Sequence, residues 1–212
     1  MTRLVLVRHG ETDWNRARRV QGRTDIPLNE TGRTQARRTA AALAGQRWDA
    51  IYASPLSRAY ETARIMAESL GLAAPEVRDA LMERNYGEAE GLTGQEVEAR
   101  FPGSIDVPGR ERRSHAVARA IPALEDIAEE HPGGRVLVVT HGGLIRSLLM
   151  RLEPGEGDHH TEAIPNGSVH SLDYAEGALA LVGFNEELVV PGEGDEDITE
   201  QNPVEGRESD RE

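Results

Sequence analysis

The chain has 212 residues, which is enough for one substantial hydrophobic core and too few for two ordinary domains and a tail. It contains no Cys, and all 24 of its basic residues are Arg. These absences exclude disulfides, thiolate nucleophiles, Fe–S clusters, phosphate-loop lysines and Schiff bases. A nucleophile in this chain must therefore be His, Ser, Thr, Tyr, Asp or Glu.

The net charge of −13 is distributed unevenly. Residues 186–212 hold 11 acidic residues against Arg207 and Arg211, so this segment carries −9 and the rest of the chain −4. Its Gly and Pro, with almost nothing apolar after Pro191, are typical of a solvated, disordered tail. We therefore expect one main domain over residues 1–188 and an acidic tail over residues 189–212, whose role stays open.

The sequence predicts neither a membrane nor a nucleic-acid partner. No stretch approaches the roughly 18 consecutive apolar residues of a membrane span, and the N-terminus leads into a short apolar run instead of a signal peptide. No basic stripe with interleaved aromatic residues is present. We expect a soluble cytoplasmic protein. Nothing in these residues fixes the oligomeric state, and a homodimer stays open.

Short apolar runs alternate with helical patterns, which is typical of a sheet with crossover helices. Residues 4–7 are uniformly apolar and predict a buried central strand. The elements expected next are a helix start at Glu11-Thr12, a helix from a cap at Asn29 or Thr31 to about Ala44, a strand over 48–53, a helix over 56–70 ended by Gly71, a short strand over 76–78 and a helix over 93–101.

A long helix is expected over residues 114–130, with a kink or break at Pro122. Residues 135–140 form the second strongly apolar run and predict another central strand. A helix over 144–152 and a hairpin of residues 168–174 and 178–184, turning at Glu176-Gly177, complete the pattern. This order predicts an α/β fold.

The two most apolar predicted strands end alike, with Arg8-His9-Gly10 after the first and His141-Gly142 after the second. The carboxyl ends of parallel strands lie along one edge of a sheet, where ligands bind, so we expect both histidines to face one crevice. A glycine after each His lets the backbone approach a ligand, and the N-terminus of each following helix favours an anion. The Arg8 guanidinium can hold two phosphate oxygens. The pattern therefore indicates a site for a phosphate group.

Other polar clusters carry less information. His159 and His160 are adjacent, without a spaced carboxylate or Cys, so we expect no metal site there. A basic cluster of Arg110, Arg112 and Arg113 lies in an irregular segment. It either contacts an anionic substrate or forms a solvated turn.

The residues around His9 and His141 resemble the motifs of the histidine phosphatase (phosphoglycerate mutase-like) superfamily, which includes cofactor-dependent phosphoglycerate mutases and many phosphatases. The likeness extends in order over about residues 3–150. The matching segments are residues 6–15, 21–22, 25–29, 32, 35–36, 54–59, 62–63, 81–87, 90–91 and 139–143. The resemblance implies a three-layer α/β sandwich, with a mostly parallel central sheet between helices on both faces, and makes residues 1–188 the catalytic domain.

The resemblance also implies a role for each matching residue. His9 is the nucleophile that becomes phosphorylated, and Glu83 is the proton donor and acceptor. Arg8, Arg58 and His141 surround the transferred phosphoryl group. The phosphate- and substrate-binding positions further include Asn15, Gln21, Gly22 and Gly142.

This chemistry suits the residue types. A neutral imidazole is a competent nucleophile near pH 7, and a phosphohistidine splits one difficult displacement into two easier ones. Two arginines and a second imidazole neutralise the phosphoryl oxygens, so we expect neither a metal nor another cofactor. One carboxyl group, on Glu83, protonates the leaving oxygen and then takes a proton from the attacking water.

The resemblance leaves three functions open. In the mutase branch a longer insertion separates the acid/base glutamate from the second histidine, whereas Glu83 and His141 are only 58 positions apart. This favours a phosphatase acting on a small phosphorylated metabolite. Many family phosphatases also have Gly-Glu-Ser where this chain has Gly109-Arg110-Glu111-Arg112, which leaves the substrate-contacting loop undetermined. The alternatives are a cofactor-dependent phosphoglycerate mutase and, from another class, an inactive phosphate-binding scaffold.

Overall fold

The computed structural model describes residues 1–104, 107–153, 159 and 161–186. The expected tail over residues 189–212, the domain boundary at residue 188 and the side chain of His160 lie outside the described residues. Within them, no helix is long and apolar enough to cross a membrane.

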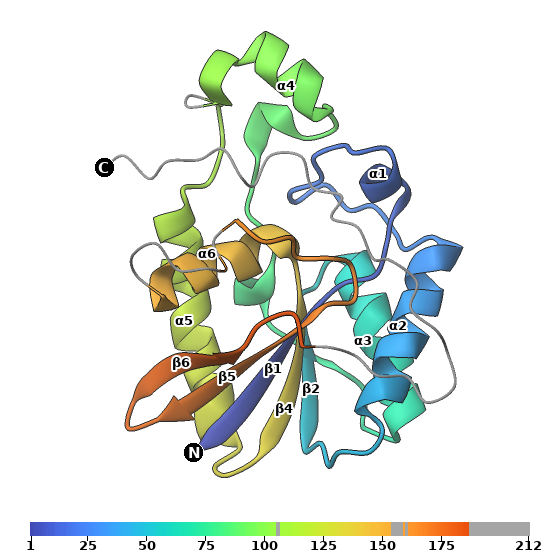
Figure 1. Ribbon diagram of the computed structural model, residues 1–212, viewed down its shortest axis with the longest axis vertical. Coiled ribbons are helices and arrows are strands. Elements are labelled where there is room, and N and C mark those ends of the chain that lie inside the picture. The colour runs from blue at the N-terminus through green and yellow to red at the C-terminus, as the bar shows by residue number, and fades with distance from the viewer. Residues whose placement is uncertain (105–106, 154–158, 160, 187–212) are drawn as a thin grey trace.

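A six-stranded sheet forms the centre of the molecule (Figure 1). Its strands, in spatial order, are β3 (Glu76–Val77), β2 (Ala50–Ala53), β4 (Arg135–Thr140), β1 (Thr2–Arg8), β5 (Val169–Ala175) and β6 (Ala178–Gly183). The first four are parallel, whereas β5 runs antiparallel to β1 and β6 antiparallel to β5. The expected hairpin is present, with positive φ angles at both turn residues, Glu176 and Gly177. The predicted mostly parallel sheet is therefore confirmed.

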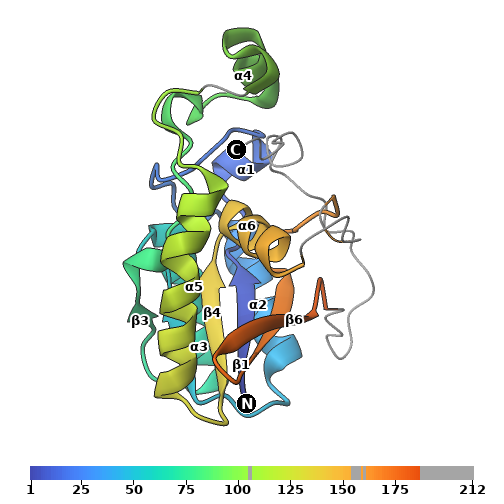
Figure 2. The same cartoon turned by 90° about the vertical axis from the view of Figure 1, so that its left-hand side faces the viewer.

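Helices cover both faces of the sheet, as Figures 1 and 2 show. On one face lie α2 (Glu30–Leu43) and α3 (Ser57–Leu70), and on the other α5 (Arg113–Glu130) and α6 (Gly142–Leu152). Two short helices, α1 (Asp13–Arg16) and α4 (Gly94–Arg100), lie beyond the upper end of the sheet in both views. The described residues also include 3-10 turns at Asp79–Leu81, Gly87–Ala89 and Pro102–Ser104. The expected three-layer α/β sandwich is confirmed.

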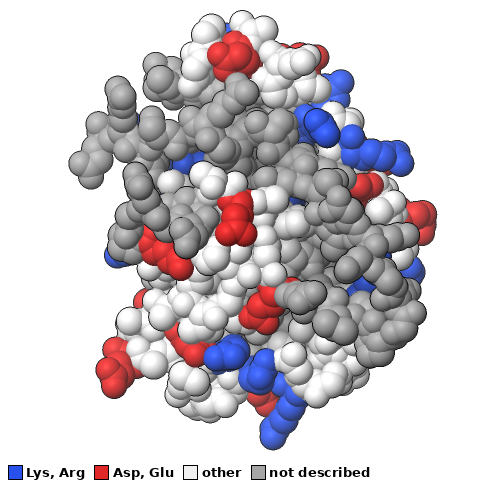
Figure 3. All heavy atoms as spheres, in the orientation of Figure 1, with Lys and Arg blue, Asp and Glu red and all other residues white. Residues whose placement is uncertain are grey.

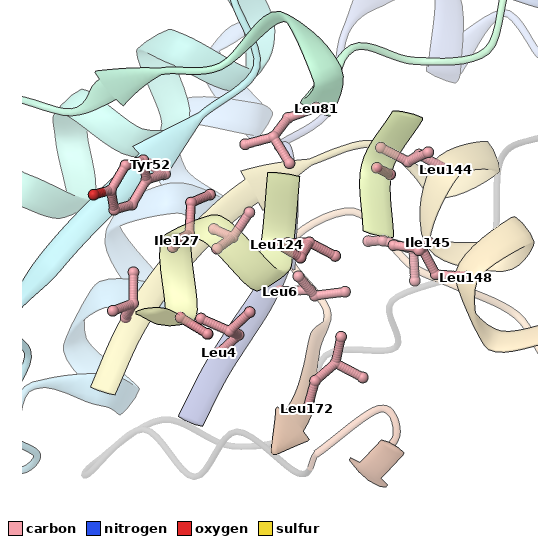
Figure 4. Close-up of a cluster of buried hydrophobic side chains, with 14 of the residues drawn as sticks. Leu4, Leu6, Tyr52, Leu81, Leu124, Ile127, Leu144, Ile145, Leu148 and Leu172 are labelled. Carbon is pink, nitrogen blue, oxygen red and sulfur yellow. The ribbon is translucent and has the colours of Figure 1, made fainter. Parts of the chain in front are cut away.

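Alternate side chains of β1 supply two separate cores. Leu4 and Leu6 pack with α5 and α6, in the cluster shown in Figure 4, whereas Val5 and Val7 pack with α2 and α3. Because successive side chains of a strand point to opposite faces, a strand covered on both sides must be apolar at every position. This explains why residues 4–7 are uniformly apolar.

The structure corrects two of the expected helices. α5 is continuous from Arg113 to Glu130, so Pro122 does not break it, and the alternative of a kink stays a prediction. A helical Pro leaves the carbonyl four residues earlier without its N–H partner, and here that residue, Ala118, is exposed to water. α6 begins at Gly142, not at residue 144, because His141 is its N-cap and the two glycines form its first turn. The other predicted elements differ only at their ends.

Candidate active site

Strands β1 and β4 bring the two histidines together at the upper end of the sheet. The strands pair in register, with Arg8 opposite Thr140, and the His9 N–H donates to the Thr140 carbonyl at 3.0 Å. The imidazole rings of His9 and His141 have centroids 5.1 Å apart and planes inclined by 61°. Two residues that are far apart in the sequence therefore lie side by side.

The His9 ring has a defined orientation. Its Nδ1 lies 2.7 Å from the Gly10 carbonyl oxygen, which can only accept, so Nδ1 carries the proton. Nε2 then bears the lone pair and accepts from Nε of Arg58 at 3.3 Å. Burial, and then the charges of Arg58 and Arg8, lower the pKa of His9 well below its ordinary value of 6.5. At neutral pH His9 is an uncharged imidazole with its lone pair directed toward a guanidinium.

His141 packs against the His9 ring and is fully buried. Its Nε2 is 2.7 Å from the hydroxyl of Ser54, which lies just beyond β2. Burial lowers the pKa of His141 well below 6.5, with smaller contributions from the neighbouring arginines and from His9. Both imidazoles are therefore uncharged at neutral pH.

Two arginines complete the cationic side of the site. Arg58, in the first turn of α3, is 0% exposed and donates to the carbonyls of Gly22 at 2.7 Å and Thr24 at 3.0 Å. Burial lowers the pKa of Arg58 to about 10, which leaves it charged at pH 7. Arg8, at the end of β1, is 2% exposed and donates to the carbonyl of Ile164. The site therefore holds two buried positive charges.

Glu83 faces the same region from the loop after the 3-10 turn Asp79–Leu81. Its Oε1 accepts from the backbone N–H of Arg84 at 2.7 Å, and its Oε2 accepts from the N–H of Gly143 at 2.9 Å. Gly143 belongs to the first turn of α6, immediately after His141. Backbone donors thus hold the carboxylate beside the second histidine.

A small cavity opens among these groups. It is lined by Arg8, His9, Asn15, Arg19, Gln21, Gly22, Arg58, Glu83, Tyr86 and Gly142. Eight of the nine residues proposed from the sequence line it, and the ninth, His141, contacts it through the His9 ring. Among the described residues, no group of three or more His, Asp or Glu side chains is placed to hold a metal ion.

Sequence reasoning assigned no role to several residues of the site. Arg19 and Tyr86 line the cavity. Thr62 accepts from the Gly10 N–H at 3.1 Å, and Asn166 donates to the His9 carbonyl at 2.9 Å. Tyr86 and Thr62 lie within the matched motifs, which was the signal available for them. Arg19 and Asn166 lie in stretches without a recognisable pattern.

The structure gives a second reason for a glycine at position 10, besides the expected access of the backbone to a ligand. A Cβ atom there would overlap the backbone of Gly32, and a Cβ at Gly32 would overlap the backbone of Glu11. The first turn of α2 therefore packs directly on the chain that follows His9. The glycine serves helix packing as well as access to the site.

The basic cluster of Arg110, Arg112 and Arg113 does not act as one unit. Arg110 lies over the Tyr86 ring, with its Cζ 5.5 Å from the ring centroid, and so approaches the rim of the cavity. Arg112 is exposed, and Arg113 is buried beside a separate groove between α5 and α6. On the face drawn in Figure 3, the described Arg side chains lie singly or in small groups among acidic ones.

Comparisons with known proteins place this geometry in a family. Residues 4–187 match the family described as "Histidine phosphatase superfamily (branch 1)". The chain is 38% identical over 185 residues to the "Uncharacterized phosphatase PhoE" of Bacillus subtilis, covering 87% of this chain and 95% of that protein.

Two solved structures are also similar. A mycobacterial glucosyl-3-phosphoglycerate phosphatase, described as a complex with VO3, has a TM-score of 0.78 at 32% identity, covering 87% of this chain and 99% of that one. A phosphoserine phosphatase of Entamoeba histolytica, in complex with 3-phosphoglyceric acid, has a TM-score of 0.76 at 28% identity, covering 88% and 98%. The chain therefore belongs to branch 1 of the histidine phosphatase superfamily and is a phosphatase.

Proposed function

We propose that this phosphatase hydrolyses small phosphomonoesters through a phosphohistidine at His9, without a metal ion, and that Glu83 transfers the proton. The observation that carries the proposal is the His9 Nε2 lone pair, which lies 3.3 Å from Arg58 in a cavity that Glu83 also lines. Nucleophile, cation and carboxyl group thus surround one small volume.

In the first step, the lone pair of His9 Nε2 attacks phosphorus, and the bond from phosphorus to the ester oxygen breaks. Glu83 in its protonated form gives that proton to the departing oxygen, so an alcohol leaves. The hydrogen bond from Nδ1 to the Gly10 carbonyl stabilises the positive charge that develops on the ring.

In the second step, water attacks the phosphohistidine and the N–P bond breaks. The Glu83 carboxylate takes a proton from the water, which restores both residues and releases inorganic phosphate. Arg8 and Arg58 hold the negative phosphoryl oxygens in both steps, and His141 donates a hydrogen bond to them. Two guanidinium groups can fill this role without a metal ion.

The proposed substrate is a small phosphorylated metabolite. The lining of the cavity supports this class, because the buried guanidinium groups of Arg8 and Arg58 suit a phosphate group and Arg19 and Tyr86 line the same cavity. The similar structures carry the names of phosphatases for glucosyl-3-phosphoglycerate and phosphoserine. We propose residues 1–188 as the catalytic domain.

Rapid-quench labelling with ³²P-labelled phosphomonoesters tests the mechanism. We expect acid-labile label on the wild-type protein, no label on His9→Ala, and phosphate release that persists in EDTA. A strict requirement for a divalent cation would contradict the mechanism. Isomerisation of phosphoglycerate that depends on a bisphosphoglycerate primer, without net phosphate release, would identify mutase chemistry instead. Phosphate binding without label or turnover would identify a scaffold.

A further inference from the structure

The acid/base proposal places strict demands on a loop without regular structure. Glu83 lies outside every helix and strand, after the 3-10 turn Asp79–Leu81. A proton donor must lie within hydrogen-bond reach of the leaving oxygen, and small displacements of catalytic groups cost large factors in rate. Something must therefore hold the main chain of this loop in place.

The backbone carbonyl of Glu83 is held by two arginines from other parts of the chain. Arg119, on α5, donates to it through Nη2 at 3.2 Å, and Arg23 donates through Nε at 3.4 Å. Arg119 also donates through Nη1 to the carbonyl of Ala80 at 2.6 Å. Its guanidinium thus spans the loop from residue 80 to residue 83.

One carboxylate orients both arginines. Glu111 accepts from Arg119 Nε at 2.9 Å and from Arg119 Nη2 at 3.0 Å, a two-point arrangement, and lies 3.5 Å from Arg23 Nη2. The Glu111 and Arg119 side chains are only 14% and 21% exposed. Such paired, partly buried bonds fix the direction of a guanidinium better than a single exposed contact does.

Glu111 also grips the loop directly, two residues beyond Glu83. Its carboxylate accepts from the Asn85 N–H at 3.2 Å, and its own N–H donates to the Asn85 carbonyl at 2.7 Å. Its carbonyl accepts from Nη2 of Arg84 at 2.9 Å. Burial acts to raise the pKa of Glu111, but the bonds from Arg119 and Asn85 outweigh it and lower the pKa, so Glu111 is charged at neutral pH.

We propose that Glu111 and Arg119 are positioning residues that hold the main chain of Glu83 against α5, while Gly143 of α6 holds its carboxylate. This inference rests on the proposed acid/base role of Glu83. The helices α5 and α6 pack in one core on the same face of the sheet (Figures 2 and 4), so both anchors belong to one packed layer. Neither residue lines the cavity, so both would act through Glu83.

Leaving-group dependence separates this role from general support of the fold. An alkyl ester such as β-glycerophosphate needs its leaving oxygen protonated, whereas 4-nitrophenyl phosphate has a far better leaving group and needs little help. We expect Glu111→Gln to lower kcat/KM for β-glycerophosphate by roughly 10- to 100-fold, and for 4-nitrophenyl phosphate by less than about threefold. Loss of both activities in equal proportion would overturn the proposal, as would loss of neither.

The pair of Arg3 and Asp173 supplies a matched control. It has the same two-point geometry, with bonds of 2.8 and 2.9 Å, and lies at the opposite end of β1 from the site. Asp173→Asn should leave the ratio of the two kcat/KM values unchanged. Should Glu111→Gln not fold, Arg119→Lys, which keeps the charge and loses the two-point contact, is assayed by the same ratio with the same expectation.

Glu83→Gln tells the failure of this inference from the failure of the proposed function. It should lower the ratio of kcat/KM for β-glycerophosphate to kcat/KM for 4-nitrophenyl phosphate at least as far as Glu111→Gln does. A Glu83→Gln variant with an unchanged ratio would refute the acid/base role itself. A lowered ratio in Glu83→Gln together with a wild-type ratio in Glu111→Gln, or in Arg119→Lys where Glu111→Gln does not fold, would refute only the positioning role.

Discussion

The arginines near the two ends of strand β1 have opposite electrostatic surroundings. At the lower end, the hydrogen bonds from Arg3 to Asp173 raise the pKa of Arg3. At the upper end, burial lowers the pKa of Arg58 to about 10, and its guanidinium donates to two carbonyls and an imidazole. The charge of Arg3 is balanced by the Asp173 carboxylate. The charge of Arg58 is buried, and burying a charge costs free energy of folding. The upper end is therefore built for an anion that arrives from outside, at the expense of stability.

The largest effect that separates the two ends is expected from the nucleophile. His9→Ala should lower kcat by about 10⁴-fold or more, because no other group can form the covalent intermediate. Thermal unfolding of the same variant should show a folded protein. Residual turnover within tenfold of the wild type would move the nucleophile to another residue.

A second comparison pairs Arg58→Met with Arg3→Met. We expect inorganic phosphate to raise the Tm of the wild type. Removing Arg58 should lower kcat by about 10²- to 10³-fold and abolish that rise. Removing Arg3, whose side chain is 34% exposed, should cost no more than about 1 kcal/mol and leave the response to phosphate intact. Equal loss of the phosphate response in both variants would remove the contrast between the two ends.

The pH dependence of stability sharpens the comparison further. The pKa values of His9 and His141 lie well below 6.5, and burial lowers that of His170 to about 3. Below pH 6.5 these imidazoles bind protons in the unfolded chain but not in the folded protein. The free energy of unfolding therefore falls as the pH falls toward the pKa values of the folded state.

Each such imidazole contributes up to about 1.4 kcal/mol per pH unit to this loss. Urea unfolding between pH 7.0 and 5.5, where most carboxylates stay ionised, measures the slope. His9→Gln should reduce it by one histidine's share. A free energy of unfolding that rises as the pH falls from 7.0 to 5.5 would show that these imidazoles are charged in the folded protein.

The smallest effect is expected from the acidic tail. Truncation after residue 188 should leave kcat/KM for 4-nitrophenyl phosphate within about twofold, because the groups of the site among the described residues lie between Arg8 and Asn166. A larger change would assign the tail a part in catalysis and overturn the proposed domain boundary.

The sequence predicted the parts of this site that follow from regular structure. His9 and His141 could be placed together because two uniformly apolar runs had to be central strands, and parallel strands end at one edge. The start of α6 was placed too late because Gly142 and Gly143 have low helix propensity, and the N-cap position of His141 overrides it.

Other parts depend on contacts that leave no periodic signal. Arg119 holds Glu83 through a carbonyl oxygen, and Asn166 holds His9 in the same way. Every residue has a backbone carbonyl, so the residue types of Glu83 and His9 do not indicate that Arg119 and Asn166 bind to them. The continuity of α5 through Pro122 depends on the exposure of Ala118, which a local pattern does not reveal.

The contact of Gly10 with Gly32 limits how this scaffold can diversify. With main chain pressed on main chain, the segment carrying the nucleophile cannot retreat or accept a bulkier neighbour. A larger or differently shaped substrate must then be accommodated at other lining residues, such as Arg19 and Tyr86. Libraries that randomise these two positions and leave positions 10 and 32 untouched should yield new specificities with the phosphate-handling chemistry unaltered.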